Sequence, residues 1–280
     1  AAGLSAEHIA QQLENTLGRK VLLHAIDNSA AVSKLAWCTG GGQGYIEQAA
    51  AAGAQLFISG EVSEQTIHVS RELGIHFIAA GQILLLGEIQ CADLQQQAST
   101  VDVSQPEQLS QLRQSVDVLD TRVATVVQAI FDAGLFPVVI GGGHNNSYPL
   151  IKALSQASGQ QVNCANLDPH SDFRPLEGRH SGNGFRYAVE EKLLSYYHPF
   201  GLHQNYNSGS LIDAMQANGV VFPHWLDDCI DFGKELSETA KTLRQRALPI
   251  GIELDMDAIE YMPSSAISPV GITTAQARHY

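Results

Sequence analysis

The sequence has few of the features that mark secreted, membrane-spanning or metal-thiolate proteins. No run of apolar residues approaches the ~18–20 that cross a bilayer, and no signal peptide is visible. No pair of cysteines has Cys-x-x-Cys spacing, which argues against a disulfide scaffold or a zinc ribbon. The four cysteines lie far apart, at Cys38, Cys91, Cys164 and Cys229. We therefore expect a cytoplasmic protein with reduced thiols and no membrane partner.

Basic residues are also scarce. The chain has 16 Lys and Arg against 29 Asp and Glu, a formal charge of −13, so a phosphate backbone would be repelled and no nucleic-acid partner is expected. The 44% of apolar residues favour a packed core over a disordered chain. The 280 residues allow one large or two modest domains. Because the first residues are Ala-Ala-Gly rather than Met, we expect a fragment or a processed chain.

Short apolar strands alternate with amphipathic helices along the chain, which predicts an α/β fold. Continuously apolar strands between helices are typical of a mainly parallel sheet covered on both faces. The predicted strands are 20–26, 33–39, 55–59, 75–79, 83–86, 136–140, 161–167, 199–202, 220–222 and 249–254. The predicted helices are 5–17, 43–52, 63–73, 148–155, 187–195, 211–216 and 234–246.

A polar, Gln-rich stretch at 88–105 separates the two parts of this pattern and is predicted to be a loop or linker. A long helix should follow, because apolar residues recur at spacings of three and four from Leu109 to Ile130. Ser104 and Glu107 have the spacing of a capping box, and Gly134 is expected to end the helix.

Three segments place metal-type ligands directly after a predicted strand. They are VVIGGGHNNSYP, ANLDPHSDFRP and IGIELDMDAIE. Loops after parallel strands converge at the carboxyl edge of a sheet, so their ligands can meet there. The six candidate ligands are His144, Asp168, His170, Asp172, Asp255 and Asp257.

The composition of this set favours a pair of divalent cations. Four carboxylates at the ends of apolar strands repel one another unless cations lie between them. An oxygen-rich set with two imidazoles suits Mn²⁺, and two metals ~3.5–4 Å apart can generate a bridging hydroxide. Simpler interpretations exist for each segment alone. Asp-x-Asp is usually a solvated loop, and Gly141–Gly143 could be a tight turn or a phosphate loop without the Lys-Ser/Thr of a P-loop.

The three segments together, with the later SSAISPVGIT, resemble the signature motifs of the ureohydrolase family, which includes arginase, agmatinase and formimidoylglutamase. The resemblance covers about residues 83–280 and is greatest to the formimidoylglutamase branch, which acts in histidine catabolism. It implies an arginase-like three-layer α/β fold. It also implies a hydrolase of linear amidine or guanidine carbon–nitrogen bonds, with N-formimidoyl-L-glutamate as the first expected substrate and a homo-oligomer as a possible assembly.

The resemblance implies two Mn²⁺ per chain. One would be held by His144, Asp168, Asp172 and Asp255, and the other by Asp168, His170, Asp255 and Asp257. Asp172 would also accept the proton of the bridging hydroxide, which would attack the amidine carbon.

Further residues are assigned only by the same resemblance. Ser181 and Asn183 match positions that hold the carboxylate of the substrate in arginase. The proton-shuttling histidine of arginase is replaced by Phe185, and His180 is the nearby alternative. Arg174, Arg179 and Arg186 could pair with a dicarboxylate substrate or simply solubilise the surface. The chain ends before the region where arginase has the glutamate that reads a guanidinium group, so we expect a domain at 82–280 that is truncated at both ends.

Residues 5–81 resemble a different family. The segment KLAWCTGGGQGYIEQAAAAGAQLFISGEVSEQTIHVSRELGIHFIAAG is similar to the C-terminal part of YbgI-like proteins, the GTP cyclohydrolase I type 2 family. The His-x-x-x-Glu that completes the dinuclear site of that family is missing after Gly81. His68 and His76 are therefore expected to serve packing or surface polarity.

The two resemblances predict a mosaic joined near Gly81–Gln82, with a partial α/β segment at 1–81. This segment could fill a sheet edge of the following domain, or the chain could be an artificial fusion. Two functional alternatives stay open beside the hydrolase: a YbgI-like dinuclear-metal protein, and a remnant that binds metal without catalysis.

Overall fold

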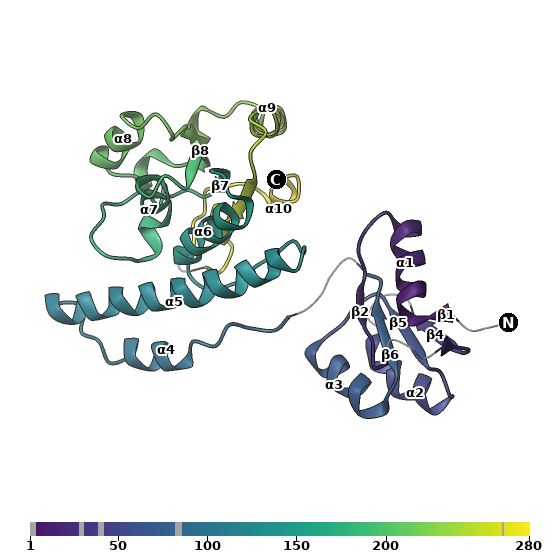
Figure 1. The fold of residues 1–280 in the computed structure, drawn as a ribbon. Coiled ribbons are helices and arrows are strands. Elements are labelled where there is room, and N and C mark those ends of the chain that lie inside the picture. The colour runs from purple at the N-terminus through teal and green to yellow at the C-terminus, as the bar shows by residue number, and fades with distance from the viewer. Residues whose placement is uncertain (1–3, 28–30, 39–41, 82–85, 265) are drawn as a thin grey trace. The chain divides into compact units, whose positions relative to one another are not determined.

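The computed structural model describes residues 4–27, 31–38, 42–81, 86–264 and 266–280. The chain divides into two compact units, Ala1–Glu88 and Ile89–Tyr280, and each is an α/β layer structure in its own right (Figure 1). We find no helix in the described parts that is both long and apolar enough to cross a membrane.

The first unit is built on a four-stranded sheet in the order β2-β6-β5-β4, in which β2 is antiparallel and the others are parallel. Its strands are β2 (Leu22–His24), β4 (Leu35–Cys38), β5 (Leu56–Ser59) and β6 (His76–Ala79), with a separate pair β1 (Leu4–Ser5) and β3 (Ala31–Val32). Its helices are α1 (Ala6–Leu17), η1 (Gln43–Tyr45), α2 (Ile46–Ala51) and α3 (Glu64–Leu73).

Helices cover both faces of this sheet because successive strand residues point to opposite sides. Leu56 and Ile78 pack with Ala6 and Ala10 of α1, whereas Phe57 and Phe77 lie in the cluster that includes α2. Helix α1 is capped by Ser5, as predicted, since its side chain accepts a hydrogen bond from the backbone of His8.

The second unit contains an all-parallel sheet in the order β10-β7-β8-β9. Its strands are β7 (Val162–Leu167), β8 (Leu194–Leu202), β9 (His224–Trp225) and β10 (Ile250–Leu254). Its helices are α4 (Ala92–Ala98), α5 (Pro106–Asp132), α6 (Ser147–Ser158), α7 (Gly184–Glu190), α8 (Gly209–Gln216), α9 (Phe232–Gln245) and α10 (Thr274–Ala277). Short 3-10 turns are η2 (His144–Asn146), η3 (Ser181–Asn183), η4 (Gln204–Tyr206), η5 (Leu226–Asp228) and η6 (Met256–Ala258).

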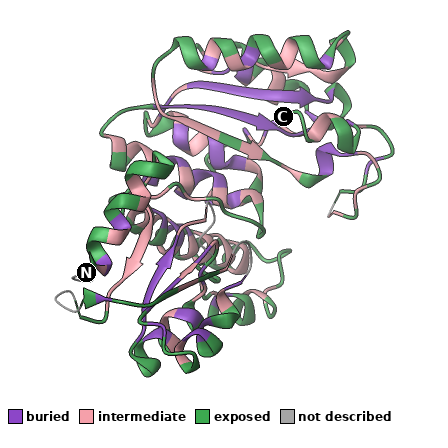
Figure 2. Cartoon of the chain, turned by 90° about the vertical axis from the view of Figure 1, so that its right-hand side faces the viewer, coloured by how far each residue is buried: buried purple, intermediate pink, exposed green. Residues whose placement is uncertain are grey.

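This unit has three layers. Cys164 of β7 and Tyr197 of β8 pack in one cluster with Ile151 of α6 and Ala188 of α7. On the opposite face, residues of the same two strands pack with Leu243 of α9. The central strands are therefore covered on both sides and buried almost throughout (Figure 2), which is the α/β arrangement that the sequence predicts.

Several predicted elements differ from the structure. The predicted strand at 136–140 does not form: these residues pair with no strand among the described residues, and Phe136 and Ile140 are 81% and 92% exposed. A strand needs a neighbour for its backbone groups, and apolar composition alone does not supply one. The strand predicted at 83–86 falls largely outside the described residues.

The stretch predicted as a loop or linker contains a helix, α4, in which the side chain of Leu94 is buried.

The expected capping box of α5 is absent. The Ser104 hydroxyl donates a hydrogen bond to Asp102 instead, and Gln105 takes the cap position without a side-chain hydrogen bond. Pro106 does occupy the first turn of α5, and the helix ends just before Gly134, which has a φ of +72°.

The hypothesis that the N-terminal segment fills a sheet edge of the second unit stays a prediction. The described strands of residues 4–81 pair only with one another. This segment has hydrophobic clusters of its own, around Leu56 and Phe57, and so has a separate core.

Candidate metal centre

The six candidate ligands come together at the carboxyl ends of two neighbouring strands. Strands β7 and β10 are parallel partners with Leu167 beside Leu254, so the loops that follow them start side by side. The third contribution comes from the turn after the glycine run. We call the following residues the aspartate–histidine cluster: His144, Asp168, His170, Asp172, Asp255 and Asp257.

His144 lies at the centre of one half of the cluster. Its Nδ1 atom is 2.8 Å from Asp172 Oδ2, 3.1 Å from Asp168 Oδ2 and 3.2 Å from Asp255 Oδ2. The ring meets Phe185 edge to face, with centroids 5.5 Å apart. One imidazole nitrogen thus faces carboxylates from both strand-end loops.

His170 forms the other half of the cluster. Its Nδ1 atom lies 3.4 Å from Asp168 Oδ1 and 3.3 Å from Asp257 Oδ2. The ring stacks on Tyr206 at a centroid distance of 5.4 Å, and Tyr206 stacks in turn on His203. Asp168 therefore has one carboxylate oxygen facing each histidine.

The loop after β7 is shaped by its own hydrogen bonds. Asp168 is fully buried, and its carboxylate accepts hydrogen bonds from the backbone of His170 and the side chain of Asn166. Asp172 has a φ of +45°, in the left-handed region that non-glycine residues seldom occupy. Such strain gathers at functional sites, where the surrounding structure imposes it.

The charges of the cluster perturb its titration. Burial on its own lowers the pKa of His144, but Asp168, Asp172 and Asp255 together raise it well above the usual value. Hydrogen bonding to Asp168 and Asp257 raises the pKa of His170 to about 10. Burial raises the pKa of Asp172. The protein thus concentrates carboxylates where only positive charge makes their burial tolerable.

The donor set fits divalent cations. His144 Nδ1 and Asp257 Oδ1 are buried and have no partner in hydrogen-bond geometry. Within this cluster, two sets of three side chains have ligand atoms within 4.8 Å of one another. One set is His144, Asp168 and Asp172, and the other is Asp168, His170 and Asp257. Asp168 belongs to both groups, which suits a bridging carboxylate, and the oxygen and imidazole donors suit ions such as Mn²⁺.

Glu253 is a member of this site that the sequence reasoning missed. It lies on β10, and its Oε2 atom is 3.5 Å from His144 Nε2, on the side of the ring away from the aspartates. Carboxylates in this position orient metal-binding histidines. The signal was available, because Glu253, Asp255 and Asp257 alternate along the chain and alternate residues share a side of an extended segment.

The residues predicted to bind substrate lie in the segment from 174 to 186. Ser181 and Arg174 are exposed, and the Arg174 side chain packs beside Gly182. His180 Nε2 is 3.2 Å from Glu177 Oε1, its Nδ1 accepts a hydrogen bond from Gly182, and burial lowers its pKa. Among the residues that the structure describes, no hydrogen bond or ion pair joins these three side chains to the aspartate–histidine cluster, so their roles stay predictions.

Asn183 has a different environment from the one predicted for a substrate ligand. It is fully buried. Its oxygen accepts from Arg179 and the His180 backbone, and its nitrogen donates to Pro175 and Gly178. All four hydrogen-bonding positions of the amide are thus used within the protein. The geometry gives Asn183 a role in holding the loop.

Of the three arginines considered for a dicarboxylate, Arg179 is not available. It is 1% exposed and pairs with Asp120 at 2.8 Å. Arg186 lies over the Phe173 ring and forms an ion pair with Glu190.

The two histidines singled out in the first unit have the roles predicted for them. His76 is buried and accepts a hydrogen bond from the backbone of Ile26, which is a packing role. His68 lies on the surface near Glu64, where it contributes polarity.

Comparison with known proteins divides the chain in two. Residues 1–83 match the family described as Duf34/NIF3 (NGG1p interacting factor 3). The GTP cyclohydrolase 1 type 2 homolog of Yersinia pestis is 47% identical over 111 residues, which are 37% of this chain and 44% of that protein. The Escherichia coli K12 homolog is 53% identical over 73 residues, 26% of this chain and 30% of that protein. The chain therefore spans less than half the length of these relatives.

Two solved structures of arginase-type enzymes are similar to this chain in fold. Formimidoylglutamase from Bacillus subtilis matches with a TM-score of 0.56 and 20% identity, over 70% of this chain and 57% of that chain, which supports the fold alone. A variant of formiminoglutamase from Trypanosoma cruzi, solved with Mn²⁺, has a TM-score of 0.50 and 26% identity, over 57% of this chain and 56% of that chain. The sequence model of the arginase family matches residues 59–280, most of the chain. The chain belongs to the arginase family.

Proposed function

We propose that this protein is a manganese-dependent hydrolase of linear amidine or guanidine carbon–nitrogen bonds. The observation that carries the proposal is the convergence of six ligands from three separated segments, with Asp168 facing both histidines. The first ion would be held by His144, Asp168, Asp172 and Asp255. The second would be held by Asp168, His170, Asp255 and Asp257.

Two divalent ions so held would activate a water molecule as the nucleophile at neutral pH. The protein contributes the means to take up its proton. Asp172 lies within the cluster, where its Oδ2 atom is 2.8 Å from His144 Nδ1, and its carboxylate is the proposed acceptor of this proton. Its strained backbone fixes the carboxylate toward His144.

N-formimidoyl-L-glutamate is our first choice of substrate. Water adds to the formimidoyl carbon, the bond from this carbon to the amino acid nitrogen breaks, and that nitrogen receives a proton, so the products are formamide and L-glutamate. The formimidoylglutamase-like motifs and the similarity to the 26% identical formiminoglutamase variant of Trypanosoma cruzi support this choice. Exposed Arg174 and Ser181 are the proposed contacts for the carboxylates of the substrate, and His180 is the proposed proton shuttle.

A substrate panel tests the proposal. The Mn²⁺-loaded chain is incubated with N-formimidoyl-L-glutamate, arginine, agmatine or guanidinobutyrate, and formamide and urea are quantified. We expect formamide and glutamate in equal amounts from the first compound. Release of urea alone would move the substrate to the guanidine class. Metal binding with no turnover of any of the four would favour the non-catalytic alternative.

The YbgI-like alternative has less support. Among the described residues of the first unit, no three His, Cys, Asp or Glu side chains come within ligand distance of one another. The sequence similarity of this unit to GTP cyclohydrolase 1 type 2 homologs is thus not accompanied by a metal-type cluster among its described residues.

A further inference from the structure

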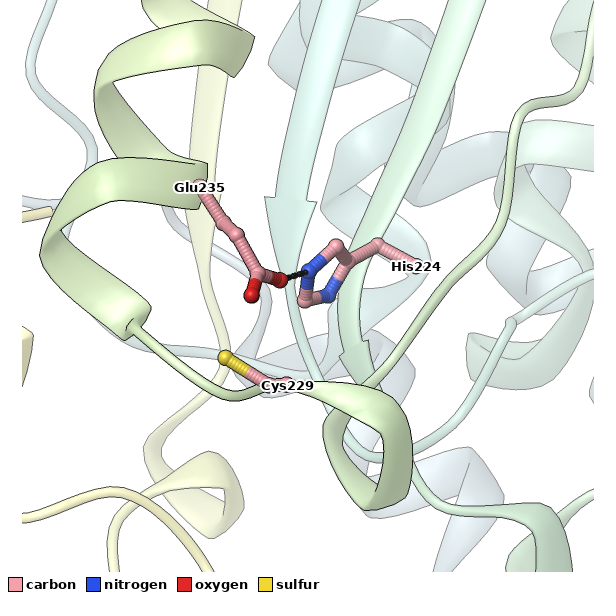
Figure 3. A group of neighbouring side chains, drawn as sticks. All are labelled: His224, Cys229 and Glu235. Carbon is pink, nitrogen blue, oxygen red and sulfur yellow. Dashed lines mark hydrogen bonds and ion pairs between the residues drawn. The ribbon is translucent and has the colours of Figure 1, made fainter.

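A second group of metal-type side chains lies away from the aspartate–histidine cluster and shares no residue with it. His224 is on β9, Cys229 follows η5, and Glu235 is in the first turn of α9. Figure 3 shows the three side chains converging from strand, loop and helix. A ligand atom from each lies within 4.8 Å of the other two. Strands β7 and β8 lie between this position and β10 in the sheet.

The surrounding structure fixes the imidazole of His224. Its ring stacks on Phe200 with centroids 4.1 Å apart and an interplanar angle of 17°, and it meets His198 edge to face. Nε2 contacts the carboxylate of Glu235. Nδ1 is buried without a hydrogen-bond partner, so hydrogen bonding leaves the ring incompletely satisfied. The side chain is held in one orientation before any ligand arrives.

The carboxylate of Glu235 ties the loop to the helix. One oxygen contacts His224, and the other accepts hydrogen bonds from the backbone of Ile230 and Asp231, at 3.1 and 3.3 Å. The loop that carries Cys229 is therefore held beside the carboxylate. Burial and a hydrogen bond to Glu235 raise the pKa of the Cys229 thiol to about 11, so a proton occupies the thiol in the metal-free protein.

We propose that His224, Cys229 and Glu235 form a second metal site, which takes Zn²⁺ or a similar thiolate-preferring divalent ion. Zn²⁺ binds nitrogen, sulfur and carboxylate oxygen at about 2.0–2.3 Å, often with three protein ligands and a water. Atoms that share such an ion lie within about 4 Å of one another, so the side chains need only a small movement. On binding, the ion replaces the thiol proton.

The thiolate separates this site chemically from the proposed manganese centre. Soft sulfur ligands favour Zn²⁺, whereas a carboxylate-rich set suits Mn²⁺. An ion held by His224, Cys229 and Glu235 would connect β9, the loop after η5 and α9. Its role would be to fix this edge of the sheet, so it goes beyond the proposed hydrolytic function and does not depend on it.

Cobalt titration tests the proposal, because Co²⁺ bound to a cysteine thiolate gives a ligand-to-metal charge-transfer band in the near ultraviolet. The full chain, stripped of metal under reducing conditions, is titrated with Co²⁺. We expect the band in the wild-type chain, its loss in C229S, and its retention in C91S as the matched cysteine control. It should also persist in D168N, in which the other metal centre is impaired.

E235Q provides a second variant that keeps the cysteine. We expect it to retain the charge-transfer band but to bind Zn²⁺ at least roughly tenfold more weakly than wild type in a chelator competition, because a neutral amide replaces a carboxylate ligand. Circular dichroism of each variant checks that the fold is retained. Absence of the band in the wild-type chain, or its persistence in C229S, would overturn the proposal.

Discussion

Asp168 and His144 meet at the centre of the aspartate–histidine cluster, where Asp168 Oδ2 lies 3.1 Å from His144 Nδ1. Asp168 is fully buried at the end of β7, and the His144 side chain is 12% exposed. A buried carboxylate is costly without a compensating positive charge, so the pair marks the point at which a cation is most needed. Substitutions of the residues around this contact should therefore affect metal binding and turnover first.

Changing Asp172 should lower turnover even when enough Mn²⁺ is present to fill the site, of which Asp172 is also a proposed ligand. In D172N the side chain keeps its size but can no longer accept the proton of the attacking water. We expect kcat for formamide release to fall by about 10²–10⁴-fold, the usual contribution of a general base. Steady-state kinetics at saturating Mn²⁺ measure the effect, and D213N, in exposed Asp213 on α8, is the matched control. Unchanged kcat in D172N would exclude Asp172 as the base.

Changing Glu253 should weaken metal binding without removing a ligand. Its carboxylate faces the ring nitrogen of His144 that points away from the aspartates. We expect E253Q to lower Mn²⁺ affinity by about 10–100-fold, as loss of such supporting carboxylates does elsewhere. Isothermal titration calorimetry compares it with E238Q, in exposed Glu238 on α9. Equal affinities in the two variants would show that Glu253 does not support His144.

The buried ion pair of Arg179 and Asp120 should matter for stability. The two side chains are 2% and 5% exposed, and removing one partner leaves a buried charge. We expect D120A to lower the free energy of unfolding by about 3–5 kcal/mol. The exposed pair of Arg122 and Asp93 is the control, and D93A should cost no more than about 1 kcal/mol.

Urea unfolding followed by Trp225 fluorescence in a W37F background measures the second unit separately. Equal losses in D120A and D93A would contradict the importance assigned to the buried pair.

His198 should make stability depend on acidic pH. Burial lowers its pKa to about 4, against about 6.5 in an unfolded chain. The unfolded state therefore binds the proton first, and the unfolding free energy falls as pH drops from 6.5 toward 4, by at most about 3 kcal/mol from this residue. In the folded chain, Nδ1 of His198 is hydrogen-bonded to the Phe222 carbonyl and Nε2 to the Thr239 hydroxyl.

The prediction for His198 is tested by the slope of unfolding free energy against pH. H198Q should have a shallower slope between pH 6.5 and 4.5 than wild type, whereas H279Q, in an exposed histidine, should keep the wild-type slope. A steeper or unchanged slope in H198Q would contradict the burial argument.

Sequence periodicity predicted the layers and the convergence of ligands because both follow from local pattern. The strands predicted at 161–167 and 249–254 formed β7 and β10, and parallel pairing of these strands brought the Asp168 and Asp255 loops together. The apolar residues at 136–140 show the limit of this reasoning, since a strand also requires a partner that periodicity cannot supply.

The other missed features depend on how nearby segments fold together, which residue spacing alone does not show. Asn183 was expected to face a substrate, but the buried Arg179 beside it occupies its amide oxygen. His224, Cys229 and Glu235 have no familiar spacing, and their side chains come together from strand, loop and helix in the folded chain. Glu253 is the exception, because its alternation with Asp255 was visible in the sequence.

The manganese stoichiometry of the full chain is the most direct test of the account. The protein is stripped of metal, loaded with Mn²⁺, freed of excess ion and analysed by atomic emission, beside D168N and D213N. We predict two Mn²⁺ per chain in the wild type and D213N, and no more than one in D168N, because Asp168 faces both histidines. Less than one Mn²⁺ per wild-type chain, or a content unchanged by D168N, would contradict the account.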